Sequence, residues 1–162
     1  MEQLVVLHEG GTMDKLAAHR APGFLHEAFS VVLLDGDRTL LQKRAATKYH
    51  FPGLWTNACC SHPTGDVVTD AQARLAFEVG IATDLEVVGS FTYRAEDPVS
   101  GLVEHEHDTV LVGRTSTAGV PNPDEVSELR WVALADLRAE LAATPQAFTP
   151  WLAGVLACAQ LS

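Results

Sequence analysis

An alternating run of acidic residues and histidines, Glu104-His105-Glu106-His107-Asp108, lies inside a stretch with the pattern of a β-strand. Alternate residues of a strand face opposite ways, so Glu104, Glu106 and Asp108 share one face. Two carboxylates about 7 Å apart on one face repel each other, and a metal ion or a shared proton would relieve that repulsion. A solvated strand face is the alternative that the pattern leaves open.

Three further histidines, His19, His26 and His62, fall in predicted loops or at a strand start. A lone histidine is more often structural than a metal ligand. Combined with the two glutamates of one strand face, however, the three would form a nitrogen and oxygen ligand set suited to a divalent metal. The sequence alone does not show that these five side chains converge.

Cys60 stands two residues before His62, within the segment that covers residues 57–63. Its functional interpretation is a thiol whose pKa is lowered by a nearby metal or cation, able to act as acid or base. The alternative is a small buried apolar residue, which is the interpretation preferred for Cys59 and Cys158. The odd cysteine count and an acidic N-terminal segment predict free thiols, no signal peptide and a cytoplasmic protein.

Basic and aromatic side chains complete the candidates. Arg44, Lys48 and Arg74 are possible phosphate contacts, although most such charges are simply solvated. Three large aromatic residues stand in irregular or edge settings: Trp55, Tyr93 and Trp151. Core packing is the default for each, whereas a reaction that passes through a carbocation would use their π faces.

The elements that must position these residues follow from punctuation and periodicity. Apolar, β-branched runs predict strands at residues 4–7, 28–34, 39–42, 85–93, 102–113 and 129–132, with a hairpin turn at 35–37. Helices are expected from Asp66 or Thr69 to about residue 79, and at 133–142 and 150–160. Residues 16–23 and 48–63 read as loops. An α+β fold, an α/β/α sandwich with a mixed sheet, in one domain over 1–162 is predicted.

Composition excludes several classes of partner. The net charge is −10 with only 11 Lys and Arg residues, which argues against a large nucleic-acid surface. No run of about 18 apolar residues is present in the sequence, so no membrane span is expected. An anionic ligand would have to be held by a local basic cluster or a metal, against the overall field.

Six ordered segments resemble type 1 isopentenyl-diphosphate Δ-isomerases, which share the Nudix fold. The most specific is Trp-Thr-Asn-Ala-Cys-Cys-Ser-His-Pro, inside residues 44–63. The resemblance covers the chain from about residue 3 to about 155. Its segments are His19 with His26, residues 44–63, 91–95, Glu104 with Glu106, 122–126 and 148–151.

The resemblance implies a role for each matching position. It implies a Zn, Mn or Mg ion held by His19, His26, His62, Glu104 and Glu106, and a second Mg ion held by Glu78 and the substrate diphosphate. It implies catalysis by Cys60 and by Glu106, the latter assisted by Tyr93. It also implies contacts with the substrate from Lys15, Arg44, Lys48, Arg74 and Trp151.

The reaction implied is a 1,3-proton shift that converts isopentenyl diphosphate to dimethylallyl diphosphate through a tertiary carbocation, in a monomer or weak homodimer. Three alternatives stay open: an isomerase or cyclase for a modified or longer prenyl diphosphate, a Nudix-type diphosphate hydrolase, and a silent binding module. The helix at residues 73–80 carries only Glu78 where the hydrolase motif needs several glutamates, which argues against hydrolysis. Residues 63–66 and the turn before Lys15 are shorter than the resemblance predicts, and this could alter the preferred substrate.

Overall fold

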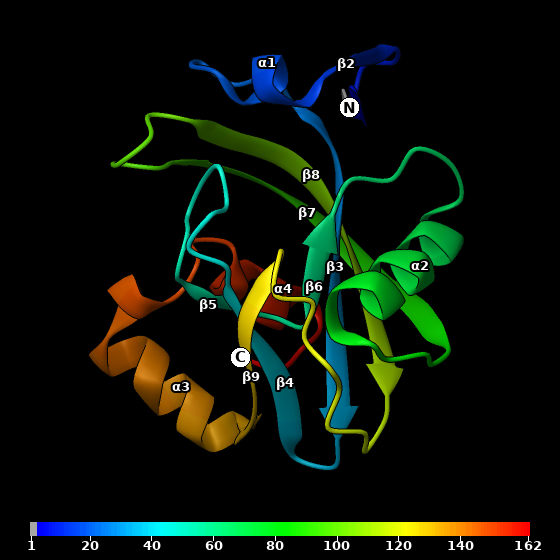
Figure 1. Cartoon of the computed structure of the whole chain (residues 1–162), viewed down its shortest axis with the longest axis vertical. Helices are drawn as coiled ribbons and strands as arrows, with labels where there is room; N and C mark the ends of the chain where they lie inside the picture. Colours follow the sequence, from blue (N-terminus) through cyan, green and yellow to red (C-terminus); the bar gives the residue numbers. More distant parts are fainter. Residues whose placement is uncertain (1–2) are drawn as a thin grey trace.

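A mixed sheet forms the middle of the molecule in the computed structural model, which describes residues 3–162 (Figure 1). The seven strands follow the order β5-β4-β3-β8-β7, with β6 beside β3 and β9 beside β4. Only β3 and β8 run parallel among these pairings. The strands are β3 (His26–Asp35), β4 (Arg38–Arg44), β5 (Trp55–Thr56), β6 (Cys59–Ser61), β7 (Leu85–Glu96), β8 (Val103–Arg114) and β9 (Val126–Ala133).

The predicted hairpin is confirmed at the junction of β3 and β4. Gly36 has a φ of 61°, in the left-handed region that a tight hairpin turn needs. The two strands form only two residue pairs, Leu34 with Thr39 and Asp35 with Arg38. Farther from the turn, β3 pairs with β6 and β8, whereas β4 pairs with β5 and β9.

One face of the sheet is covered by α2 (Val67–Val79). Its N-cap is Asp66, whose carboxylate accepts a hydrogen bond from the Thr69 amide at 2.9 Å, and Gly80 ends it in the left-handed conformation. The predicted helix and its apolar stripe are therefore confirmed. The stripe packs on alternate residues of β3 and on β8: Ala71, Leu75 and Val79 meet Phe29, Val31, Leu33 and Leu111 in one core.

The opposite face is covered by α3 (Leu134–Ala143) and α4 (Leu152–Cys158), joined by the 3-10 turn Pro145–Ala147. Trp151 and Val155 pack with Val32 and Val110, which are offset by one residue from the positions that α2 covers. The result is three layers, so the predicted α/β/α sandwich is confirmed. Within residues 3–162, no helix has the length and apolar character needed to cross a bilayer.

The N-terminal segment corrects one expectation. Strands β1 (Leu4–Val6) and β2 (Thr12–Asp14) form a small hairpin that leads into α1 (Lys15–His19), at the upper end of the view in Figure 1. Residues 16–23 were expected to be a loop, but the Asp14 carboxylate accepts from the Ala17 amide at 3.0 Å and starts a short helix. Residues 48–63 likewise contain β5 and β6, because pairing with β4 and β3 organises part of that loop.

Candidate active site

Five side chains from four parts of the chain converge at one end of the sheet; we call them the inner cluster. His19 ends α1, His26 begins β3, His62 follows β6, and the two glutamates lie on β8. One ligand atom from each lies within 4.8 Å of all the others. The members of the inner cluster are His19, His26, His62, Glu104 and Glu106.

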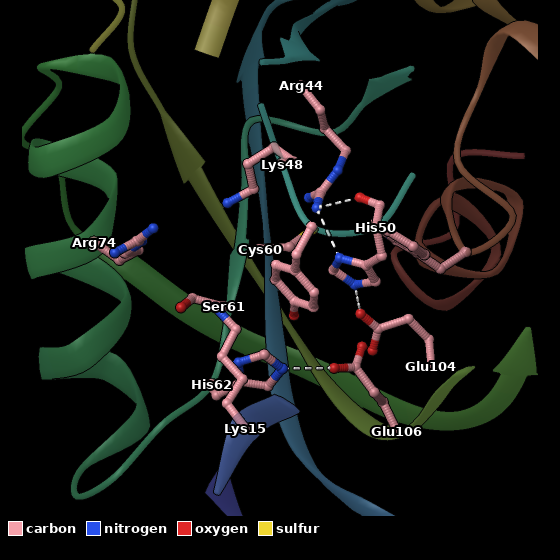
Figure 2. Close-up of a pocket in the computed structure, with 12 residues that line it drawn as sticks. Lys15, Arg44, Lys48, His50, Cys60, Ser61, His62, Arg74, Glu104 and Glu106 are labelled. Carbon is pink, nitrogen blue, oxygen red and sulfur yellow. Dashed lines mark hydrogen bonds and ion pairs between the residues drawn. The ribbon is translucent and has the colours of Figure 1, made fainter. Parts of the chain in front are cut away.

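The inner cluster is buried, so a solvated strand face is wrong for this side of β8. Glu104 is 2% exposed and Glu106 is 6% exposed. His19 Nε2 lies 3.0 Å from Glu104 Oε2, and His26 Nε2 lies 3.0 Å from Glu106 Oε2. His62 Nε2 reaches the same Glu106 oxygen at 2.9 Å (Figure 2).

The hydrogen bonds of Nδ1 in His19 and His26 indicate which ring nitrogen carries the proton. His19 Nδ1 lies 2.6 Å from the Lys15 carbonyl oxygen and His26 Nδ1 lies 2.8 Å from that of Phe24. A carbonyl oxygen only accepts, so Nδ1 carries the proton and Nε2 of a neutral ring presents a lone pair to a carboxylate. Two lone pairs facing each other need a proton or a cation between them. A divalent ion satisfies all five side chains at once, so the donor set fits a metal.

The pKa directions agree with a site built around positive charge. Burial, together with the neighbouring Glu106 carboxylate, raises the pKa of Glu104 well above its usual range. Burial lowers the pKa of His62 to about 4. Burial also opposes protonation of His26, but the bond to Glu106 outweighs it and raises that pKa. A single proton on His26 balances only its contact with Glu106. The contacts of His19 with Glu104 and of His62 with Glu106 would still lack a proton or a cation.

A pocket opens beside the inner cluster and contains the predicted catalytic thiol. Cys60, on β6, lines the pocket together with Trp151 and Glu106. The Cys60 thiol donates to Asn57 Oδ1 at 3.3 Å and lies 3.4 Å from Ser30 Oγ. The prediction of a lowered pKa is wrong for the protein groups alone, because burial and then the negative charge of Asp108 raise the pKa of Cys60 to about 12.

The four predicted phosphate contacts all line this same pocket (Figure 2). Arg74 projects from α2, Lys48 from the loop after β4, and Lys15 from the start of α1. Burial, with the charges of Lys48 and Arg74, lowers the pKa of Lys15 to about 8. Glu125 is the counter-charge of two of them, since it contacts Lys48 and lies 3.2 Å from an Arg74 nitrogen. Basic charge is thus concentrated here in a chain with a net charge of −10.

Comparison with known proteins places this geometry in a family. A NUDIX domain model matches residues 24–152. Isopentenyl-diphosphate Delta-isomerase of Nocardia farcinica (strain IFM 10152) is 57% identical over 149 residues, which cover 90% of this chain and 85% of the relative. Isopentenyl-diphosphate Delta-isomerase 1 of Aromatoleum aromaticum is 45% identical over 168 residues, with 97% of this chain and 94% of the relative covered.

The chain belongs to the isopentenyl-diphosphate Delta-isomerase family. The resemblance seen in its six segments is therefore confirmed, and so is the Nudix-like fold. A protein of Deinococcus radiodurans, DR0079, superimposes with a TM-score of 0.71 over 99% of both chains at 15% identity. RenU, a Nudix hydrolase of M. smegmatis, gives 0.53 over 94% of this chain and 89% of its own at 19% identity. These two likenesses concern the fold alone.

Two predicted site residues of this isomerase-family chain form hydrogen bonds within the protein that the sequence did not indicate. Glu78 is 3% exposed and accepts from Arg74 Nε at 2.5 Å and from Gln42 Nε2 at 3.0 Å. Arg74 lines the pocket, and Glu78 contacts Arg74 without lining the pocket itself. Arg44 is 6% exposed and donates to the carbonyl oxygens of Phe51 and His50, each at 3.1 Å. Arg44 organises the loop that forms the pocket wall as well as lining the pocket.

His50 is a site residue that the sequence interpretation missed. Its Nδ1 accepts from Arg44 at 3.3 Å, so its proton lies on Nε2, which contacts Glu104 Oε1 (Figure 2). Burial and the charge of Arg44 lower the pKa of His50, so the ring is neutral where it lies against Glu104. The signal was available: His50 stands between two aromatic residues, Tyr49 and Phe51, inside the matching segment at residues 44–63.

Proposed function

We propose that the chain converts isopentenyl diphosphate to dimethylallyl diphosphate, with Glu106 as the acid and Cys60 as the base. One observation carries the proposal: the Cys60 thiol and the Glu106 carboxyl line the same pocket, next to a wall of basic side chains. A 1,3-proton shift needs one group that gives a proton and another that takes one, with the substrate between them. The relatives' name, isopentenyl-diphosphate Delta-isomerase, supports this reaction.

The acid side is built from Glu106 and Tyr93. Burial and then the neighbouring Glu106 charge raise the pKa of Tyr93 well above its usual range, so the phenol keeps its proton and donates it to Glu106 Oε1. Burial opposes ionisation of Glu106, but the bonds from His26 and His62 outweigh it and lower that pKa, so the carboxylate must take up a proton before turnover. Transfer of that proton to the terminal alkene carbon uses the double-bond electrons to form the new C–H bond. A tertiary carbocation remains at C3. The Tyr93 hydroxyl donates a hydrogen bond to the Glu106 carboxylate that results.

The base side is Cys60. The Cys60 thiolate takes a proton from C2 and becomes the thiol, and the electrons of that C–H bond form the new double bond to C3. The raised pKa makes this thiolate strongly basic, and the thiol that results donates a hydrogen bond to Asn57 Oδ1. The Asn57 amide is held by the carbonyl oxygens of Val31 and Cys59, each at 2.9 Å, so the thiol has a fixed acceptor.

The inner cluster is proposed to hold a Zn, Mn or Mg ion through its three imidazoles and two carboxylates. Imidazole ligands suit Zn, whereas carboxylate ligands suit Mn and Mg. When bound, the ion would lend positive charge to Glu106 and strengthen it as an acid. Glu104 is kept in position for this role by the contact with His50.

The diphosphate is proposed to bind Lys15, Arg44, Lys48 and Arg74. The concentration of these four side chains at one pocket supports the assignment. Glu78 would join a second Mg ion on the diphosphate once Arg74 turns toward the phosphate and releases the carboxylate that it now contacts. Arginine suits forked contacts to phosphate oxygens, whereas lysine provides point charges.

The carbocation is proposed to face Trp151. The ring lines the pocket and is 3% exposed, and its centroid lies 5.9 Å from that of Tyr93. Such walls also exclude water, which would otherwise capture the cation. We further propose that the enzyme acts in the cytoplasm as a monomer or weak homodimer.

The test is incubation of purified protein and Mg²⁺ with isopentenyl diphosphate in deuterated water. Dimethylallyl diphosphate that carries deuterium is expected. Release of phosphate or pyrophosphate would support a hydrolase instead. Turnover only of methylated or geranyl-sized analogues would support a specialised isomerase or cyclase, the alternative that the shortened segments near residue 64 and Lys15 favour.

A further inference from the structure

A second group of metal-ligating side chains lies on the reverse face of the strands that carry the inner cluster. We call it the outer cluster; it consists of His8, Glu27 and His107. Glu27 and His107 are paired in the register of β3 and β8, one residue beyond the pair of His26 with Glu106. Because strand residues alternate between faces, the outer cluster and the inner cluster lie back to back.

The three outer side chains already lie at nearly the spacing of metal ligands. His8 Nδ1 is 2.8 Å from Glu27 Oε1, and His107 Nδ1 is 2.8 Å from Glu27 Oε2. The two imidazole rings are 4.8 Å apart between centroids. Ligands on bonds of about 2.0–2.1 Å lie roughly 3.0–3.4 Å apart around one ion, so the two imidazole–carboxylate distances are within a few tenths of an ångström of that spacing. One ligand atom from each of the three residues lies within 4.8 Å of the other two.

The outer imidazoles can exchange their Nδ1 protons for a metal at small cost. Each ring faces the carboxylate through Nδ1 alone, and the side chains of His8 and His107 are 44% and 28% exposed. Moving the ring proton to Nε2 leaves it a partner in water, and Nδ1 then presents a lone pair to the ion. The Glu27 carboxylate balances one unit of the metal charge. The side chains are partly exposed, so a metal ion can reach them from solvent.

We propose that His8, Glu27 and His107 form a second metal site, which binds a first-row divalent transition ion such as Zn²⁺. Two imidazole nitrogens with one carboxylate oxygen suit Zn²⁺ better than Mg²⁺ or Ca²⁺, which prefer sets made of oxygen alone. Three protein ligands leave at least one coordination position for water, so binding is reversible and weaker than at the buried inner cluster.

An ion at the outer cluster would fasten the N-terminal hairpin to the central sheet. His8 follows β1, and its amide donates to the Leu25 carbonyl oxygen at 3.1 Å, while Leu7 forms an isolated bridge with His26. The same N-terminal segment leads on to Lys15 and His19. Zinc bound outside would therefore restrain the segment that supplies ligands to the pocket inside.

The test counts zinc on the full chain after dialysis against excess Zn²⁺. Wild type is expected to retain one more Zn²⁺ per chain than His107→Ala or His8→Asn, whereas the matched control His105→Ala should equal wild type. His105 lies on the same face of β8, but its Nδ1 contacts the Gly23 carbonyl oxygen at 3.3 Å instead of Glu27. The inner cluster contributes equally to all four proteins, so failure of the proposed isomerase chemistry would not alter this difference.

Hydrogen exchange of the N-terminal hairpin gives a second readout. Zinc should slow exchange at residues 4–14 more in wild type and in His105→Ala than in His8→Asn, which changes only a half-exposed side chain in a turn. Equal zinc counts and equal protection in wild type and both outer-cluster variants would overturn the proposal. A lower count with His8→Asn and His107→Ala alone supports it.

Discussion

The inner and outer clusters use the same residue types and both draw on β3 and β8, yet their chemistry differs. In the inner cluster, both nitrogens of His19 and of His26 face acceptors, and the carboxylates are almost fully buried. In the outer cluster, each ring faces Glu27 through one nitrogen and the other is left to solvent. The inner arrangement needs a proton or a cation between its facing lone pairs, whereas the outer arrangement is already balanced and only permits a cation.

Burial and the partner of the second nitrogen therefore distinguish the two candidate metal sites. Removing water raises the cost of every unbalanced charge, so the inner group must be neutralised for the fold to hold it. The outer group can be balanced by protons that exchange with solvent. Four experiments should break or sharpen this distinction.

The largest effect is expected from Glu106→Gln. The amide keeps the shape of the side chain but removes both the proton donor and a charged ligand of the inner cluster, so kcat should fall by about 10⁴-fold, the upper range for a lost general acid. Deuterium incorporation into dimethylallyl diphosphate measures the rate. Glu96→Gln, on the exposed end of β7, is the control and should stay within about twofold of wild type. Equal losses in both variants would contradict the assignment.

Substitution of the two adjacent cysteines of β6 should have different effects on activity and on thermal stability. Cys60 lines the pocket, whereas Cys59 is fully buried in the core that α2 covers. Cys60→Ala should lower kcat by about 10³-fold with little change in thermal stability. Cys59→Ala should instead retain activity and lower Tm by a few degrees, because it removes buried volume. A Cys60→Ala protein that retains the wild-type rate would exclude this thiol as the base.

Chelation should affect the inner cluster most. Treatment with a strong chelator should lower activity by at least about 10²-fold and lower Tm, since an ion that binds only the folded state stabilises it. Readdition of Zn²⁺ or Mn²⁺ should restore both, and metal analysis of the restored protein should find the ion bound. If the chelated protein contained no metal and yet retained its rate and its Tm, the five-ligand site would be wrong.

The smallest effect is expected from the outer cluster. His107→Ala changes a partly exposed side chain on the reverse face of β8, so kcat should fall less than about threefold when the metal of the inner cluster is supplied. His62→Ala is the matched loss of one imidazole from the inner cluster. Its kcat should fall by about 10- to 100-fold. Similar losses in the two histidine variants, measured by the same assay, would remove the distinction between the clusters.

Most elements were predictable because their signals are local. Asp66, Gly80 and an apolar stripe specify α2, and Asp35 with Gly36 specifies the hairpin. The short helix α1 was missed because five residues give too little periodicity, and its start depends on one capping contact from Asp14. Strands β5 and β6 were missed because they are two and three residues long and depend on their pairing partners.

The sequence by itself determined the family, the layered fold and the residues that we propose carry the chemistry, since motif order and strand alternation are properties of the chain alone. Only the tertiary structure decided that His19, His26 and His62 meet Glu104 and Glu106, that Glu78 lies behind Arg74, and that the Cys60 thiol has a raised pKa. These outcomes depend on burial and on contacts between residues far apart in sequence. The same cause separates the inner cluster from the outer one: alternation places His and Glu on both faces of β8, and packing decides which face loses its water.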